Sequence, residues 1–200
     1  PSRSDQQLIQ IARAQLPATF ARVATPLLSE YVYTEATITN SRDGLVLLAG
    51  PASVYVGDQF VGRGSVPTVT TGESFTAGLG VDPSLRARRE LVERTESIQG
   101  GNRVIDFTYR LTVENFDERP LPVRLMDRMP TSQGSDIRIT LTSPGQTLST
   151  DEQYVKNEKK HGLLRWDVSA PALSAGARAF TIDYTFRVEH DKQMSVSESG

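Results

Sequence analysis

The fold class follows most directly from residues 105–113, which read IDFTYRLTV. Apolar side chains occupy every second position of this stretch, and polar side chains fill most positions between them. Successive side chains of a β-strand point to opposite faces of the sheet, so this spacing predicts a strand with one apolar and one solvated face. Residues 180–188, which read FTIDYTFRV, repeat the alternation. Shorter runs of the same kind lie at residues 32–38, 137–141 and 164–168.

Turn signals separate these runs. Gly57-Asp58-Gln59 lies between two β-rich runs and predicts a tight hairpin, because glycine adopts a positive φ without strain. Gly100-Gly101-Asn102 predicts the turn of a longer hairpin that extends from about Leu85 to Asn115. Residues 144–162 contain Pro, Gly and many charges, and they are expected to form a long mobile connection.

Composition agrees with thin sheets rather than with a thick layered core. The chain has 200 residues, of which 38% are hydrophobic, and this fraction suits sheets that keep one face in water. The length allows one large domain or two small ones. We therefore predict an all-β fold, an antiparallel β-sandwich made of two units in tandem at residues 1–90 and 91–200. A single extended sandwich is the alternative.

Charge and residue types exclude several classes of function. A net charge of −2 is too small to predict binding of nucleic acid. The sequence has no cysteine, which excludes disulfides, thiolate catalysis and cysteine-based zinc sites. It also lacks a run of eighteen apolar residues, so no membrane insertion is predicted. The chain begins at Pro1 rather than at a methionine, and we expect it to be part of a longer polypeptide.

Catalytic signatures are weak. His161 and His190 are the only histidines, and both are expected at the surface because a zinc site needs three or four convergent ligands. The nucleophile motif G-x-S-x-G does not occur. A carboxylate pair for glycoside hydrolysis is left open, although most acidic residues fit the wet faces of strands. We predict no catalytic residue, no metal and no cofactor. The carboxylates considered are Asp106, Glu114, Asp117, Asp127, Asp136, Asp167 and Asp183.

Arginines cluster at the start of the long hairpin. The four basic residues of this possible interaction patch are Arg86, Arg88, Arg89 and Arg94. The spacing puts Arg86 and Arg88 on one strand face, while Glu90 and Glu93 neutralise part of the charge. A solvated strand face is the simpler interpretation, and a patch for an acidic partner is the alternative.

Trp166 is the single tryptophan and alternates with Leu164 and Val168. This phase predicts a core position, because large aromatic side chains anchor sandwich interiors. The alternative is an exposed platform on which a carbohydrate ring stacks.

A series of landmarks follows one order along almost the whole chain. They include Leu16-Pro17-Ala18-Thr19-Phe20, Ala36-Thr37-Ile38-Thr39-Asn40, Leu47-Leu48-Ala49-Gly50-Pro51, Tyr109-Arg110-Leu111-Thr112-Val113-Glu114-Asn115 and Gly162-Leu163-Leu164-Arg165-Trp166-Asp167. This order resembles the C-terminal part of the mucoidy inhibitor A-like family, classed as domain of unknown function 4139. The resemblance implies a strand rather than a helix at residues 8–15, where the residues alone allow both. It also implies an absent N-terminal portion and a place in the bacterial cell envelope or periplasm.

The second half has a looser likeness. Val113-Glu114-Asn115, Pro120, Leu164-x-Trp166 and Tyr184-x-Phe186-x-Val188 are similar in order to immunoglobulin-like repeats of bacterial surface proteins. This likeness implies immunoglobulin-like units, and it concerns architecture alone.

The resulting hypothesis is a non-enzymatic structural or protein-interaction module of a bacterial envelope-associated protein. Its expected partner is the absent N-terminal portion of its own polypeptide or another envelope protein, and the oligomeric state is left open. A carbohydrate-binding module and a polysaccharide-acting hydrolase with a carboxylate pair are the alternatives.

Overall fold

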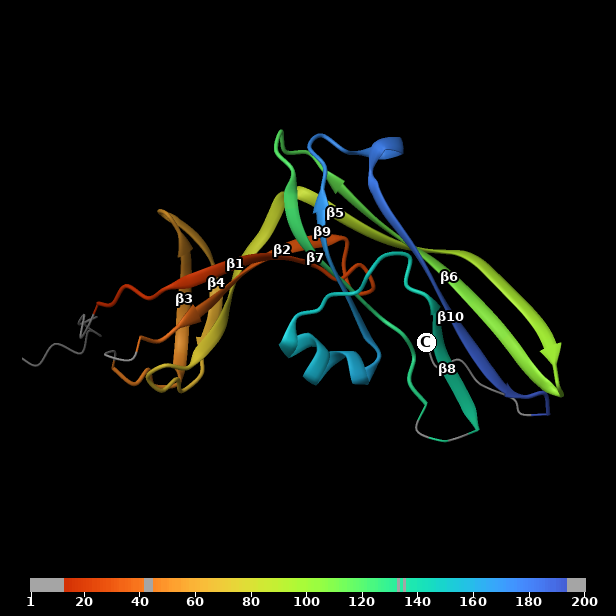
Figure 1. Ribbon diagram of the computed structural model, residues 1–200. Coiled ribbons are helices and arrows are strands. Elements are labelled where there is room, and N and C mark those ends of the chain that lie inside the picture. The colour runs from red at the N-terminus through yellow and green to blue at the C-terminus, as the bar shows by residue number, and fades with distance from the viewer. Residues whose placement is uncertain (1–12, 42–44, 133, 135, 194–200) are drawn as a thin grey trace, which may run out of the picture. The chain divides into compact units, whose positions relative to one another are not determined.

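The computed structural model describes residues 13–41, 45–132, 134 and 136–193 (Figure 1). Strands dominate these residues and helix is limited to short turns, so the all-β prediction is confirmed. The strands are β1 Ala18–Ala24, β2 Tyr31–Thr39, β3 Gly50–Val56, β4 Gln59–Val66, β5 Ser74–Gln99, β6 Asn102–Asn115, β7 Leu121–Arg128, β8 Ile137–Ser143, β9 Leu163–Ala170 and β10 Phe180–Asp191. The short helical turns are η1 Tyr154–Glu158, η2 Lys159–His161 and η3 Gly176–Arg178.

The chain packs into two compact units made of interleaved segments. The first combines the chain up to Phe20 with Glu35–Leu79, and the second combines Ala21–Thr34 with the chain from Gly80 onward. The predicted boundary between residues 90 and 91 lies within β5. The proposal that residues 1–90 and 91–200 fold as separate domains stays a prediction, as does their immunoglobulin-like character.

The first unit contains the two-stranded sheet of β3 and β4. Val56 pairs with Gln59 across a turn in which Gly57 has a φ of 60°, so the hairpin predicted at this position is confirmed. Nearby, the buried Asn40 donates hydrogen bonds from Nδ2 to three backbone carbonyls of the surrounding loops. Its amide group therefore links the loop around Leu45 to the segment at Val69 and Thr70.

The second unit contains most of an eight-stranded sheet with the order β8-β10-β6-β5-β2-β1-β7-β9. β5, β6, β10 and β8 pair antiparallel in turn, as do β7 and β9. The sheet is mixed, however, because β1 pairs parallel with β7, Val23 lying opposite Arg124. The core brings together Leu111 of β6, Tyr184 of β10 and Leu125 of β7, and β7 lies in the opposite half of the strand order from β6 and β10. The sheet thus packs its apolar face on itself, which is a sandwich-like arrangement.

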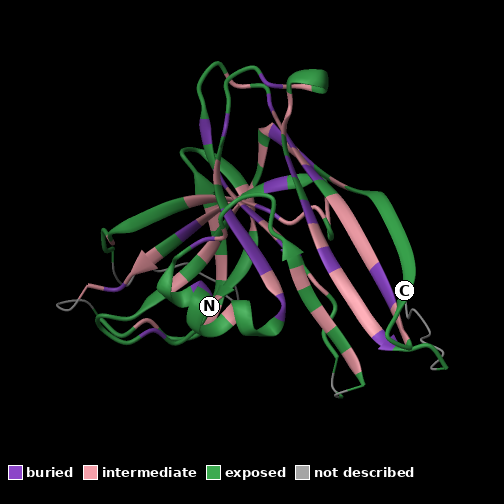
Figure 2. Cartoon of the chain, turned by 45° about the vertical axis from the view of Figure 1, so that its right-hand side comes forward, coloured by how far each residue is buried: buried purple, intermediate pink, exposed green. Residues whose placement is uncertain are grey.

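The core of the second unit confirms the prediction for Trp166. Its side chain is fully buried against Tyr184, with 5.5 Å between ring centroids. Its Nε1 donates to the backbone carbonyls of Pro144 at 3.1 Å and Gln146 at 3.3 Å, so the buried indole is also satisfied. Buried and less buried bands alternate along the strands in Figure 2, as expected for amphipathic strands.

Two expectations about local structure need correction. The connection at residues 144–162 contains η1 and η2, and it is anchored by the buried Tyr154, whose hydroxyl donates to the carbonyl of Leu163 at 3.1 Å. Residues 13–15 are not in a strand, and the rest of the strand expected at residues 8–15 lies outside the described residues.

Candidate interaction surface

The hairpin of β5 and β6 carries the candidate site. Its strands pair antiparallel from Leu85 opposite Asn115 up to the turn, as the sequence predicted. Gly100 and Gly101 form that turn, with φ values of 58° and 92°. A two-residue turn with positive φ at both positions matches the twist of the strands that it joins. The glycines therefore allow one long, regular hairpin.

The outer edge of β5 is open beyond the start of β2. β2 begins at Tyr31, and just before it the carbonyl of Glu30 accepts a hydrogen bond from the backbone N–H of Ala87 at 2.9 Å. β5 continues to Gln99. Within the described part of the chain, no strand pairs with residues 88–99 on the side away from β6. We call residues 88–99 the open edge.

The open edge exposes apolar side chains as well as charged ones. Leu91, Val92 and Ile98 are 49%, 42% and 66% exposed. In Figure 2 this part of β5 is almost entirely green, whereas β6 and β10 carry purple and pink bands. A bulge between Leu91 and Glu93 shifts the register with β6. An edge of this kind presents free N–H and C=O groups to another strand, and charges and bulges are the usual protection against indiscriminate pairing.

An aromatic ladder covers one face of the same hairpin. Phe107 of β6 stacks on Phe186 of β10 with 5.3 Å between ring centroids, and Tyr109 stacks on Phe186 at 6.0 Å. β5 adds two cations to this face. The guanidinium carbon of Arg94 lies 5.6 Å from the centre of the Phe107 ring, and that of Arg89 lies 3.5 Å from the Tyr109 ring. Both distances are within the range of cation–π attraction.

Arg89 also belongs to a buried polar cluster. Its Nε donates to Oδ2 of Asp127 at 2.9 Å, and the hydroxyl of Tyr184 donates to the same oxygen at 2.7 Å. The Asp127 side chain is 0% exposed and that of Arg89 is 17% exposed. Burial, followed by the charge of Asp127, raises the pKa of Tyr184 far above its usual value, so this hydroxyl remains a donor. The cluster is an ion pair held inside the core.

The structure separates the four arginines of the predicted patch. Arg86 lies over the ring of Tyr31 at 5.3 Å, and Arg88 is 4.0 Å from Glu30 in the loop before β2. These two arginines lie opposite polar residues of β6, whereas Arg89 lies opposite Leu111 on the aromatic face. The fourth arginine lies further along β5, on that same aromatic face. They do not form one continuous basic surface.

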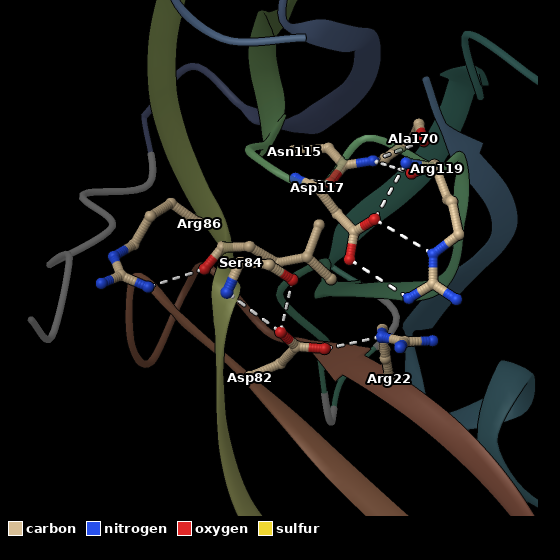
Figure 3. Close-up of polar contacts among 9 residues, drawn as sticks. Arg22, Asp82, Ser84, Arg86, Asn115, Asp117, Arg119 and Ala170 are labelled. Carbon is tan, nitrogen blue, oxygen red and sulfur yellow. Dashed lines mark hydrogen bonds and ion pairs between the residues drawn. The ribbon is translucent and has the colours of Figure 1, made fainter. Parts of the chain in front are cut away.

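Two polar clusters hold the base of the hairpin (Figure 3). The buried Asn115 donates to three backbone carbonyls and accepts a hydrogen bond from the N–H of Asp117 at 2.9 Å. On β5, Asp82 accepts hydrogen bonds from Arg22 at 2.6 Å and from the Ser84 hydroxyl at 2.5 Å. Burial opposes ionisation of Asp82, but the hydrogen bonds from Ser84 and Arg22 outweigh it and lower its pKa. These two clusters hold β5 and the end of β6 at the base from which the open edge extends.

Cross-strand ion pairs occupy the polar face of β6 and β10. Arg187 binds Asp106 through two nitrogens at 2.8 and 2.9 Å, and Arg110 binds Asp183 at 2.8 and 2.7 Å. The hydrogen bonds from each arginine lower the pKa of its carboxyl partner. A lowered pKa keeps a carboxyl group ionised, whereas the general acid of a glycosidase needs a raised one. The carboxyl groups with a lowered pKa are Asp82, Asp106, Asp117, Asp151 and Asp183.

The two histidines differ in burial. His161 is exposed in η2, as expected. The surface prediction for His190 is wrong: it is buried, and its Nδ1 lies 2.8 Å from the carbonyl of Asp191. His190 occupies the same alternate positions as the apolar side chains of β10, so it points to the same face of the sheet, and this explains its burial. Within the described ranges, no three His, Asp or Glu residues are grouped to hold a metal, and no helix is long and apolar enough to cross a membrane.

These features define an all-β domain with a long hairpin in which, among the described strands, the open edge of β5 pairs with β6 alone. The chain belongs to the family described as a domain of unknown function (DUF4139), which matches residues 5–192. It is similar to Protein F37C4.5 of Caenorhabditis elegans, with 25% identity over 157 residues, or 77% of this chain and 28% of that protein. The chain thus spans less than a third of the length of this curated relative. No solved structure matches the chain.

Proposed function

We propose that the domain is a non-enzymatic protein-interaction module that accepts an extended segment of a partner on the open edge of β5. The observation that carries this proposal is the open edge itself, which β6 pairs on one side while the other side is exposed. Strand addition obtains its affinity from backbone hydrogen bonds and its specificity from alternate side chains. The exposed Leu91, Val92 and Ile98 supply apolar contacts for such a segment.

The charged groups favour binding over catalysis. The ion pairs of Asp106 with Arg187 and of Asp183 with Arg110 place each carboxylate against a cation on the polar face. The pKa shifts of these carboxyl groups are downward, so they suit fixed charge rather than proton donation. The buried Arg89 and Asp127 satisfy each other and have the character of a core ion pair.

The resemblance to mucoidy inhibitor A-like proteins supports an envelope setting for the partner. In that setting the segment on the open edge comes from the N-terminal portion of the same polypeptide or from another envelope protein. The nematode relative indicates that similar sequences also occur outside bacteria. The proposal of strand addition therefore does not depend on the compartment. The envelope setting rests on the resemblance to bacterial proteins.

Site-specific photo-crosslinking tests the proposal. A photoreactive amino acid replaces Glu96 on the open edge of the full-length protein in its native cell, and Arg110 on the polar face serves as the matched control site. We expect Glu96 to crosslink to one short protein segment, identified by mass spectrometry, and Arg110 to give little product. Equal labelling from both sites, or no product from Glu96, would show that the edge is not a binding surface.

Carbohydrate binding is the second candidate, and one observation in the first unit favours it. Tyr55 and Phe60 are both more than half exposed on the β3–β4 hairpin, and their ring centroids are 5.5 Å apart. Exposed aromatic rings are surfaces on which sugar rings stack. If this pair binds envelope polysaccharide, the substitution Tyr55→Ala should abolish retention in affinity electrophoresis, whereas Tyr33→Ala should not. Unchanged migration of the unmodified protein in polysaccharide gels would remove this candidate.

A further inference from the structure

The open edge directs a defined set of backbone groups outward. The residues that flank a two-residue turn form a hydrogen-bonded pair, and hydrogen-bonded and non-hydrogen-bonded pairs then alternate along the hairpin. The register with β6 runs without a shift from Glu93 to Gln99. Counting from the turn, Thr95 and Ser97 direct their N–H and C=O groups toward β6. The residues that direct these groups away from β6 are Arg94, Glu96 and Ile98.

Among pairing centres from Glu93 to Ser97, the charges favour one way for two copies to pair. Opposed residues of an antiparallel pair share a face, so a symmetric pair of identical strands is centred on one residue. Centres at Glu93, Arg94 or Glu96 put like charges directly opposite each other. A centre at Ser97 puts Glu96 opposite an apolar side chain. A centre at Thr95 puts Arg94 of each copy opposite Glu96 of the other, and opposite charges at such positions are stabilising.

We propose that the open edges of two copies of this chain pair antiparallel about a two-fold axis at Thr95. This inference rests on the proposed strand addition and names its partner as a second copy. Arg94 and Glu96 already form an ion pair within one chain at 3.3 Å, and pairing adds the same contact between chains twice. It also brings the exposed Ile98 of one copy beside Val92 of the other. The surface is self-complementary, so the assembly closes as a dimer.

Cysteine crosslinking tests the register. The chain has no cysteine, so Thr95→Cys introduces a single thiol. In the proposed dimer the two residues form a non-hydrogen-bonded pair with Cα atoms about 4.5 Å apart, within the range of about 4.4–6.8 Å for a disulfide. We expect a covalent dimer under mild oxidation. Ser97→Cys, on the same face, is the control, because its two thiols lie four residues out of register, about 13 Å apart.

Charge exchange tests the contacts. Arg94→Glu or Glu96→Arg alone puts like charges opposite each other, and each should raise the dimer dissociation constant at least about tenfold in sedimentation experiments. The double variant with both substitutions restores opposite charges and should recover dimerisation. Failure of the double variant to recover, while thermal unfolding of the monomer is unchanged, would overturn the register.

The outcomes separate this inference from the proposed function. A crosslink from Glu96 to a different protein, with no disulfide from Thr95→Cys, overturns self-pairing and leaves strand addition supported. Equal disulfide formation by Thr95→Cys and Ser97→Cys indicates random collision and also overturns it. Absence of both the Glu96 crosslink and the Thr95→Cys disulfide removes both proposals. A disulfide dimer from Thr95→Cys, with little from Ser97→Cys, supports both.

Discussion

Arginines of β5 stack on aromatic rings at two levels of the hairpin, and the levels differ in their surroundings. At the inner level Arg89 stacks on Tyr109 and binds Asp127, whose side chain is completely buried. At the outer level Arg94 lies over an aromatic ring and pairs with Glu96, and both of these charged side chains are more than one third exposed. The residue types and the contact are alike, but one level belongs to the core and the other to the surface.

This difference teaches that burial, rather than the list of contacts, determines what each arginine does. An exposed ion pair is worth little because water and salt screen it. A buried pair is costly to break, because removal of one partner leaves the other charge without compensation in a medium of low polarity. The inner level therefore stabilises the domain, and the outer level is free to form contacts with another strand.

Removal of the inner arginine is the strongest test of the comparison. Arg89→Ala leaves the carboxylate of Asp127 buried without its cation, and we expect the free energy of unfolding to fall by about 3–5 kcal/mol. Urea denaturation followed by circular dichroism measures this loss. A loss below about 1 kcal/mol would show that water reaches Asp127 freely and that the two levels are equivalent.

Substitution of Trp166 on β9 tests the same core from the opposite side of the strand order. Trp166→Ala removes a fully buried indole, and we expect a loss of about 3–5 kcal/mol in the free energy of unfolding. The native fluorescence spectrum should be blue-shifted and resist quenching by iodide. A red-shifted spectrum that iodide quenches fully would contradict the core position.

The sequence predicts the strands well because alternation is a local property. It predicts the long hairpin at residues 85–115 and the core position of Trp166 on that basis, and both are confirmed. The site is predicted less well. Leu85, Ala87 and Arg89 occupy every second position, so this spacing places Arg89 on the same strand face as two apolar side chains. The spacing therefore indicates that Arg89 faces inward, whereas the several arginines nearby favour a solvated face. Its partner Asp127 lies 38 residues away and pairs through tertiary packing, which no local pattern reveals.

Acid should weaken the base of the hairpin, because protonation of Asp82 removes the charge that accepts the hydrogen bonds of Arg22 and Ser84. Asp82 has a lower pKa in the folded protein than in the unfolded chain, where it is about 3.9. Such a group stabilises the fold above the unfolded pKa, and this contribution is lost as the pH falls through the folded pKa. Asp82→Asn should cost about 1–3 kcal/mol at pH 7 and reduce the steepness of acid unfolding below about pH 4.

The matching measurement compares urea unfolding at pH 7 and pH 3 for both proteins. If Asp82→Asn changes stability equally at the two pH values, the hydrogen bonds of Arg22 and Ser84 do not depend on the charge of Asp82. Asp58→Asn, in the exposed turn between β3 and β4, provides a control for the general effect of removing one negative charge.

The smallest effect is expected at the outer level, and it completes the comparison. Arg94→Ala removes a half-exposed ion pair and a long cation–π contact of 5.6 Å, so the free energy of unfolding should fall by less than about 1 kcal/mol. The measurement is made on dilute monomer, because dimerisation would add stability that depends on concentration. A loss as large as that of Arg89→Ala would mean that the outer level is part of the core. The substitution would then weaken self-association through unfolding rather than through the edge, and the assignment of this edge to binding would fail.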